Sequence, residues 1–405
     1  MGGGASIPFY VAKILEPKLD PVDDIFQISD WNQVASYVNS DEWSNKLKST
    51  DENDIGSWNY NIYQLDINGL ILLSYEIVRS SGLNECFAID PRVVGHFLRT
   101  TEGIMSRHNN HYHNFRHVID VMHGTYLMLE TFNAKQYLTD LERLALTFGA
   151  IVHDLDHPGT NNTYHSNKGT VLSIIYNDNA ILENYHCART FELFSIPECN
   201  IVSSLNATQF KEFRRLVIME ILSTDMAVHF AMKADLDKLH TRFDADYLDR
   251  KDSVLLDQKE HDLMIKVILH GSDISNPSKS WDVCKKWSDM VIEEFFAQGD
   301  LEKSENLPVS MNCDRDTTFQ DELSMNFSDF IVGPFYQSIT KLLPNAFVTC
   351  DNLNKNRSQW FDMYRTRVDA DNADEALQEK LDKWHARAVG ATKGFEDIIT
   401  EAKAR

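Results

Sequence analysis

The 405-residue chain is poor in positive charge, since 39 lysines and arginines stand against 61 aspartates and glutamates, for a net charge of −22. Nucleic-acid binding needs clustered cations against the phosphates, so this balance argues against that class of protein. It also argues against adsorption to anionic lipid. An anionic substrate would need a local positive charge, which a metal centre could supply.

Long apolar runs and paired cysteines are lacking as well. No stretch approaches the ~18 apolar residues of a membrane-spanning helix, and no secretory signal is visible. The six cysteines are scattered, with no CxxC pair. This usage is typical of reduced thiols. We therefore expect a cytoplasmic location, or the cytoplasmic face of a membrane if the chain is part of a longer anchored protein.

Alternating strand patterns are nearly absent, whereas helical spacing of apolar residues recurs along most of the chain. The run "LERLALTFGAIVHDL" (141–155) opens with a capping box of Thr139 and Glu142 and stops at "DHPG". Three further helical runs are 210–226, 259–274 and 281–299. The last of them is expected to end at Gly299. The sequence therefore predicts an all-α fold, a compact multi-helix globule.

Histidines are concentrated in one region, because ten of the fifteen lie between His96 and His186. His113 and His117 are four residues apart, so on a helix they would share a face. His108, His111 and His123, in the same region, are interpreted as ordinary polar residues.

A second group of polar side chains lies at the ends of apolar runs. His153 and Asp154 follow one such run, His157 comes four residues after His153, and Asp273 ends another run. Such groups are costly to bury unless something satisfies them, and a divalent metal would do so. Each histidine alone is more typical of a hydrogen-bonded core or surface residue, but the joint pattern favours a metal site. If the aspartate bridges, two cations ~3.5–4 Å apart could ionise a water and clamp a phosphoryl group.

Five segments of the chain resemble the catalytic domain of class I cyclic nucleotide phosphodiesterases. They stand in that family's order and spacing, and the resemblance covers roughly residues 70 to 365. The resemblance implies a helical fold of the HD-domain phosphodiesterase type with a deep metal-containing pocket. The segments are "YHNFRHVIDV" (112–121), "HDLDHPGTNN" (153–162), "YNDNAILENYH" (176–186), "ILSTDM" (221–226) and "HGSDISNPSKSW" (270–281).

The resemblance also implies a set of metal ligands. Asp154 would be shared by Zn²⁺ and a second divalent cation, Mg²⁺ or Mn²⁺. The implied zinc ligands are His117, His153, Asp154 and Asp273. The side chains implied around the second cation and its waters are His157, Thr224 and His186.

The implied reaction is metal-dependent hydrolysis of 3',5'-cyclic nucleotides, cGMP, cAMP or both, to nucleoside 5'-monophosphates. A hydroxide that bridges the two cations would attack phosphorus. Glu183 would orient this hydroxide, and His113 would act as the general acid to the departing 3' oxygen.

For the purine, the resemblance implies a clamp of Phe327 and Val291, although plain core packing also explains both residues. Family members usually carry a glutamine three residues before the phenylalanine, where this chain has Ser324. Gln320 lies four residues earlier. A serine hydroxyl can donate or accept, so it does not select one purine. Further residues expected at the substrate are Asn276, Tyr112, Met226 and Ile274.

Two alternatives remain open: an HD-type phosphohydrolase acting on another phosphoester, and a catalytically weak module that binds cyclic nucleotides. The expected partner is a cyclic nucleotide and not nucleic acid, and no membrane span is predicted. An upstream regulatory domain and a homodimer are also left open.

The expected parts of the chain are a linker and surface-wrapping segment (1–65), the catalytic domain (66–368) and a helical tail (369–405). The start "MGGGAS" fits N-myristoylation, with Gly2 and Ser6, and it also fits a leftover cloning linker. In the tail, an apolar stripe indicates a helix packed on the body or, alternatively, a partner-binding helix. The stripe consists of Leu377, Leu381, Trp384 and Ala388.

Overall fold

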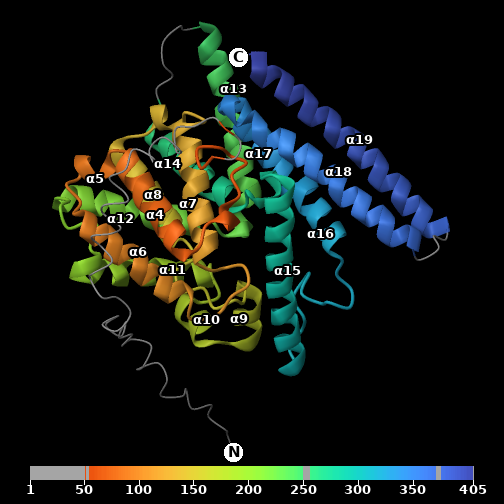
Figure 1. Cartoon of the computed structure of the whole chain (residues 1–405), viewed down its shortest axis with the longest axis horizontal. Coiled ribbons are helices and arrows are strands. Elements are labelled where there is room, and N and C mark those ends of the chain that lie inside the picture. The colour runs from red at the N-terminus through yellow and green to blue at the C-terminus, as the bar shows by residue number, and fades with distance from the viewer. Residues whose placement is uncertain (1–50, 52–53, 250–255, 371–374, 405) are drawn as a thin grey trace, which may run out of the picture.

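Every regular element in the part of the chain that the structure describes is a helix, which confirms the all-α prediction (Figure 1). The structure is a computed structural model and describes residues 51, 54–249, 256–370 and 375–404. The α-helices are α4 (Ile67–Ser80), α5 (Leu83–Cys86), α6 (Pro91–Met105), α7 (Phe115–Glu130), α8 (Asp140–Val152), α9 (Asn162–Lys168), α10 (Val171–Tyr176), α11 (Ile181–Ser195), α12 (Ala207–Leu222), α13 (His229–Asp249), α14 (Gln258–Asp273), α15 (Trp281–Ser304), α16 (Gln320–Phe327), α17 (Gly333–Leu342), α18 (Phe347–Ala370) and α19 (Glu375–Ala404).

Shorter helical turns connect these elements. The segment η6 (Ser328–Val332) is a π-helix that joins α16 to α17 without a break. The 3₁₀ turns are η1 (Ile62–Gln64), η2 (Ala134–Tyr137), η3 (Pro197–Cys199), η4 (Met226–Val228), η5 (Asn276–Ser278) and η7 (Pro344–Ala346).

The capping box that the sequence predicts at Thr139 and Glu142 is confirmed, and two further helices start in the same way. At α8 the Thr139 side chain accepts from the Glu142 backbone, and the Glu142 side chain accepts from the Thr139 backbone. These reciprocal bonds satisfy N–H groups that the first helical turn leaves without partners. The same box opens α12 with Asn206 and Gln209, and α14 with Asp257 and Glu260.

Two predicted helix ends are wrong. Helix α8 ends at Val152, three residues before the predicted end of that run. Helix α15 does not end at Gly299 but continues to Ser304. The glycine is needed there for a close approach, because a Cβ atom at Gly299 would lie 1.9 Å from the carbonyl oxygen of Cys313.

Helix α7 lies at the centre of the fold and is buried along nearly its whole length. It packs against α8, α14 and α4, and α8 packs in turn against α12. In Figure 1, α18 and α19 run side by side in blue at the right, next to α15 and α16. Apolar side chains of α7, α8 and α14 are tightly packed in the hydrophobic core, which fixes the positions of these three helices relative to one another.

The two ends of the chain are described only in part. Residues 1–50, with the "MGGGAS" start, lie outside the described residues. From residue 54 onward the chain packs closely, and Ile55, Trp58 and Ile62 are buried. In the tail, Trp384 is buried and Leu381 is partly buried, whereas the side chains of Leu377 and Ala388 lie outside the described part.

Candidate functional site

Four predicted metal ligands meet at the start of α7 and the ends of α8 and α14. His117 lies in the first turn of α7, His153 caps the end of α8 with Asp154 directly after it, and Asp273 is the last residue of α14. One ligand atom of each lies within 4.8 Å of the others. Residues from separate parts of the sequence therefore form one compact donor set.

The spacing of these atoms fits a shared cation. His117 Nε2 is 3.3 Å from Asp154 Oδ2 and 3.2 Å from Asp273 Oδ1. His153 Nε2 is 3.1 Å and 3.3 Å from the same two oxygens. Ligands about 2.1 Å from one cation lie roughly 3.0–3.4 Å apart at octahedral or tetrahedral angles. The four atoms are therefore at coordination spacing.

Burial and charge lead to the same conclusion. The Nε2 atoms of His117 and His153 are buried and have no hydrogen-bond partner among the described residues. Burial opposes the charge on His153, but the facing carboxylates of Asp154 and Asp273 raise its pKa well above the ordinary value. Burial likewise opposes the charge on Asp154, yet the charge on His153 holds the pKa of this carboxyl well below its usual range. The carboxylates of Asp154 and Asp273 therefore require a nearby positive charge, which a divalent cation would supply.

A second group of possible ligands surrounds the other oxygen of Asp154. His186 Nε2 is 3.7 Å from Asp154 Oδ1, and His157 joins these two residues in a second possible ligand group. His157 Nδ1 accepts from the Gly159 backbone at 3.0 Å. Gly159 has a φ of +78°, and a Cβ atom there would lie 2.6 Å from Asn110 Oδ1, so only glycine fits this turn.

His113 lies beside the ligand cluster but not on the helix that the sequence predicts. That part of the prediction is wrong, because Asn114 caps α7 and leaves His113 in the preceding turn. The rings of His113 and His117 are nevertheless 5.6 Å apart, and His113 Nε2 is 4.0 Å from Asp154 Oδ2. His113 also stacks on His157, with ring centres 3.9 Å apart.

Glu294 of α15 holds His113 in place, and the sequence reasoning missed this residue. One Glu294 oxygen accepts from His113 Nδ1, and the other accepts from the backbone N–H groups of Tyr112 at 2.8 Å and His113 at 3.1 Å. Burial lowers the pKa of His113, but the carboxylates of Glu294, Asp154 and Asp273, with Glu294 foremost, together raise this pKa to about 9. Despite burial, contact with His113 lowers the pKa of Glu294 to about 2.

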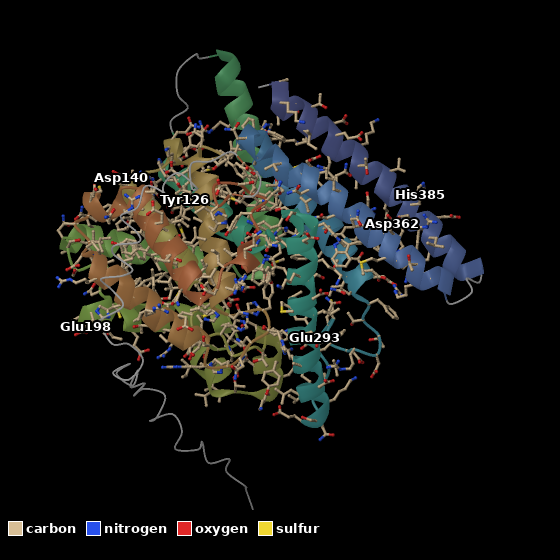
Figure 2. All side chains as sticks on the ribbon, in the orientation of Figure 1. Tyr126, Asp140, Glu198, Glu293, Asp362 and His385 are labelled. Carbon is tan, nitrogen blue, oxygen red and sulfur yellow. The ribbon has the colours of Figure 1, made fainter. Side chains whose placement is uncertain are left out.

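A signal for this carboxylate was present in the sequence. Glu294 follows Trp287 and Val291 at helical spacing, so it lies on the buried face of α15. Its neighbour Glu293, marked in Figure 2, is exposed. An acid on an apolar helix face requires a partner, and here the partner is 181 residues away in the chain.

Glu183 and Thr224 line the same cavity as Asp154 and Asp273. Asn162 donates to both carboxylate oxygens of Glu183, at 3.2 and 3.0 Å. Burial nevertheless raises the pKa of Glu183 to about 7. The Thr224 hydroxyl donates to the Ile221 carbonyl at 2.8 Å, so its oxygen is left to accept from a ligand or a water.

The cavity has a volume of about 500 Å³ and is lined by polar groups near the ligands and by apolar groups farther away. Phe327 ends α16, Val291 lies on α15, and both are half-buried on the cavity wall. The other predicted substrate residues also line the cavity, namely Asn276, Ser324, Tyr112, Met226 and Ile274.

Two polar groups on the apolar wall are held by neighbours. Asn276 accepts from the Tyr112 hydroxyl and donates to Asp120 at 3.5 Å, so its amide orientation is fixed. Ser324 shares a hydrogen bond of 2.9 Å with Ser288.

Gln320 does not line the cavity. Its amide nitrogen donates to Ser288 at 3.0 Å and to Asp289 at 2.6 Å. The hydrogen bond between Ser288 and Ser324 uses one of their two hydroxyl hydrogens. Ser288 already accepts from the Gln320 amide, so the second hydroxyl hydrogen is available to a ligand, whichever serine donates within the pair.

Comparison with known proteins assigns the family. The sequence profile of the 3'5'-cyclic nucleotide phosphodiesterase family matches residues 112–353. The chain belongs to this family. The predicted family is therefore confirmed.

Individual relatives of this phosphodiesterase domain agree. The 3',5'-cyclic-nucleotide phosphodiesterase regA of Dictyostelium discoideum is 33% identical over 355 residues, which are 87% of this chain and 44% of that protein. The human high affinity cGMP-specific 3',5'-cyclic phosphodiesterase 9A is 33% identical over 346 residues, which are 85% of this chain and 55% of that protein. The chain thus spans less than two thirds of the length of these relatives.

The fold has a solved counterpart. The crystal structure of the phosphodiesterase domain of Salpingoeca rosetta rhodopsin phosphodiesterase matches with a TM-score of 0.73 at 27% identity. It covers 81% of this chain and 96% of that chain. The helical architecture expected for this phosphodiesterase is confirmed. None of the described helices combines the length and the apolar character that crossing a bilayer would require.

Proposed function

We propose that this chain hydrolyses 3',5'-cyclic nucleotides, cAMP, cGMP or both, to nucleoside 5'-monophosphates. The observation that carries the proposal is that Asp154 and Asp273 of the four-residue ligand cluster line one cavity of about 500 Å³ together with His113. A cavity of this size suits a mononucleotide, because ligand pockets usually span ~300–1,000 Å³. The activity in the names of the Dictyostelium and human relatives supports the same substrate class.

We propose Zn²⁺ as the cation held by the four-residue cluster, because imidazole and carboxylate ligands suit that ion. A second cation, Mg²⁺ or Mn²⁺, would share Asp154, with its waters held by His157, His186 and Thr224. When bound, the two cations would supply an ionised water and positive charge against the phosphoryl oxygens.

The acid and the orienting groups come from the chain itself. The oxygen of a hydroxide, a water that has already lost one proton, bonds to phosphorus and keeps its hydrogen while the bond between phosphorus and the 3' oxygen breaks. A proton passes from His113 Nε2 to that 3' oxygen. Glu294 accepts from His113 Nδ1, so the ring keeps Nε2 directed at the cavity. Glu183 would accept a hydrogen bond from the attacking hydroxide and orient it.

The purine would lie between Phe327 and Val291, which present apolar surface on two helices. Ser324 has one short hydroxyl where family members usually carry a glutamine. A single rotatable hydroxyl can face either the adenine or the guanine edge. We therefore propose activity on both nucleotides, with high Michaelis constants.

We propose the cytoplasm as the place of reaction. All six cysteines are free, and five of them are buried, which suits a reducing compartment. An upstream regulatory domain and a homodimer remain predictions from the sequence.

The test is a set of initial rates on cAMP, cGMP and a linear phosphodiester, with and without a chelator. We expect turnover of the cyclic substrates, loss of turnover with the chelator, and recovery with Zn²⁺ plus Mg²⁺. Turnover of only the linear ester would favour the general phosphohydrolase. Binding of cyclic nucleotide without turnover, even after Zn²⁺ and Mg²⁺ are added, would favour the binding module.

A variant separates the proton donor from the metal site. We expect His113→Ala to keep its metal content and to lose on the order of 10²–10⁴-fold in kcat, the usual contribution of a general acid. Normal turnover with normal metal content would rule out His113 as the acid.

A further inference from the structure

The wall of the nucleotide cavity is supported from behind by a helix that lies outside the family match. The match ends at residue 353, whereas α19 begins at Glu375. Helix α19 packs along α18 and against α17, and α18 packs against α16. Helix α16 carries Ser324 and Phe327, so α19 is one layer away from the cavity.

A small hydrophobic cluster links α19 to that wall. Trp384 of α19 is buried in it, and its ring centre is 6.0 Å from that of Tyr364 on α18. Met325, in the same cluster, is fully buried and directly follows Ser324. Cys284 and Trp360 complete the link, because both belong to the cluster and also line the cavity.

Ion pairs join the same two parts of the molecule. Lys380 of α19 lies 2.8 Å from Glu322 of α16. Arg387 of α19 lies 3.4 Å from Asp329 of η6 and stacks over the ring of Trp384, with 4.3 Å to its centre.

The segment that α19 supports has an unusual geometry. The residues after Phe327 form the π-helix η6, a geometry that is rare and mostly found in single turns at functional sites. At its end, a Cβ atom on Gly333 would lie 2.7 Å from the Ser328 carbonyl oxygen and 3.0 Å from the Phe395 ring of α19. Phe395 is buried, so α19 also closes over the end of this segment.

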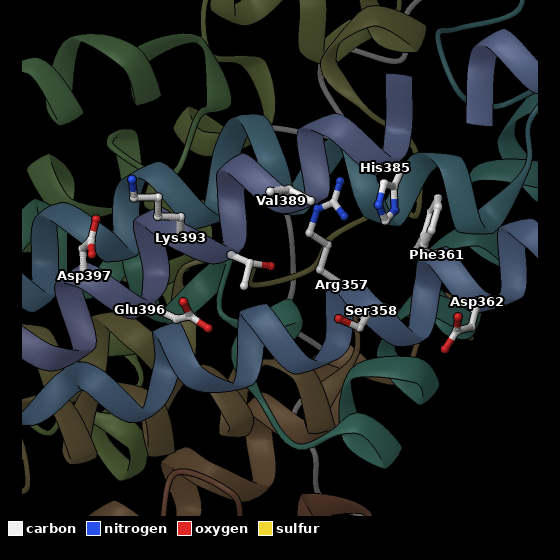
Figure 3. A pocket seen from close by; sticks show the side chains of 10 residues that line it. Arg357, Ser358, Phe361, Asp362, His385, Val389, Lys393, Glu396 and Asp397 are labelled. Carbon is white, nitrogen blue, oxygen red and sulfur yellow. The ribbon is translucent and has the colours of Figure 1, made fainter. Parts of the chain in front are cut away.

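Between these two attachments α19 is packed less tightly. A groove of about 660 Å³ runs between α18 and α19 (Figure 3). Arg357 from α18 and His385 and Val389 from α19 line it. Val389 is 59% exposed, so this part of α19 contributes little packing. Apart from the two ion pairs, α19 therefore supports the cavity wall through Trp384 at one attachment and Phe395 at the other.

We propose that α19 positions the nucleotide clamp, with Trp384 and Phe395 as positioning residues that keep α16 and η6 in place behind Ser324 and Phe327. The proposal rests on the proposed function, because the clamp is defined by the nucleotide. Neither side chain lines the cavity. Loosening them should weaken substrate binding without disturbing the cations or the acid.

The kinetic test compares Trp384→Ala with Trp384→Phe and with Val389→Ala as a matched control on the same helix. We expect Trp384→Ala to raise KM for cyclic nucleotide at least fivefold, with kcat and metal content within twofold. Trp384→Phe should restore KM to within twofold, and Val389→Ala should leave it unchanged. An unchanged KM in Trp384→Ala, or an equal rise in Val389→Ala, would overturn the proposal.

Hydrogen exchange tests the proposal independently of turnover. In Trp384→Ala, amides of residues 320–332 should exchange at least tenfold faster, and those of residues 115–130 in α7 should be unchanged. If residues 320–332 exchange faster in the variant but the native chain does not hydrolyse cyclic nucleotides, the proposed function fails while α19 still positions the wall. Unchanged exchange in residues 320–332 would refute the positioning role even in an active enzyme. If Trp384→Ala does not fold, Arg387→Gln decides the matter by the same two criteria, with an expected KM rise of at least twofold.

Discussion

At the residue scale, the proton on His113 depends on a carboxylate from another helix. Glu294 binds Nδ1 of His113 with one oxygen and two backbone N–H groups with the other. A carboxylate can accept at both oxygens, whereas an amide cannot. The charge on Glu294 therefore fixes both the orientation and the protonation of the ring.

Glu294→Gln should lower kcat on the order of 10²-fold, because the amide nitrogen would face either the backbone N–H groups or the ring N–H. Metal content and KM should stay within twofold, since Glu294 is not among the four ligands. Steady-state kinetics and metal analysis of the purified variant provide the measurement. A kcat within twofold of the native value would contradict this role.

Ser324→Ala should raise KM for both nucleotides by about two- to tenfold, because a net hydrogen bond contributes ~0.5–1.5 kcal/mol. The rise in KM should be similar for cAMP and cGMP if the rotatable hydroxyl binds both purines. Asn326→Ala, an exposed position on the same helix, is the matched control. A change confined to one nucleotide would show that Ser324 discriminates between purines.

At the element scale, helix starts follow local rules, but the end of α15 does not. Capping boxes use residues three apart, so the sequence alone reveals them. Glycine often ends a helix, yet α15 continues past Gly299. The glycine is needed there because the absence of a side chain leaves room for the Cys313 carbonyl. Only the approach of a distant loop distinguishes these two uses of glycine.

Two glycine-to-alanine substitutions should therefore change the free energy of unfolding in opposite directions. Gly299→Ala should destabilise the fold by about 1–3 kcal/mol, the usual cost of overpacking, since its Cβ would overlap a backbone oxygen. Gly103→Ala in α6 meets no atom within 4 Å and should stabilise by about 0.5–1 kcal/mol. Urea unfolding of both variants is the measurement. A stabilising Gly299→Ala would mean that the 1.9 Å approach is not a real constraint.

At the scale of the whole molecule, buried histidines make stability depend on pH. Burial and the positive charge of Lys279 lower the pKa of His123 to about 4. The unfolded chain titrates this group near ~6.5. Between these values the unfolded state binds a proton that the folded state does not, so His123 stabilises fully above the unfolded pKa and progressively less as the pH falls toward 4.

The melting temperature should therefore fall as the pH is lowered from 7.5 toward 5. His123→Gln keeps a donor for the Ile55 carbonyl and removes the titration, so its melting temperature should fall less steeply. Thermal unfolding at several pH values, with both proteins compared at each pH, gives the difference. Parallel curves would show that His123 does not contribute to the acid sensitivity.

Much of this protein was determined by short stretches of its sequence. Helical periodicity of apolar residues and the near absence of strand patterns predicted an all-α fold, and "HDLDHPG" with its companion segments indicated the family. These signals are readable because helix formation and ligand spacing are local properties of consecutive residues. They also identified side chains that the fold brings together at the start of α7 and the ends of α8 and α14.

Tertiary structure alone decided the remaining features. It joined Glu294 to His113 across 181 residues, turned Gln320 toward Asp289 and away from the cavity, and set Trp384 behind the nucleotide wall. None of these contacts follows from spacing along the chain. They arise when separate helices pack and each buried polar or apolar group finds a partner on another helix.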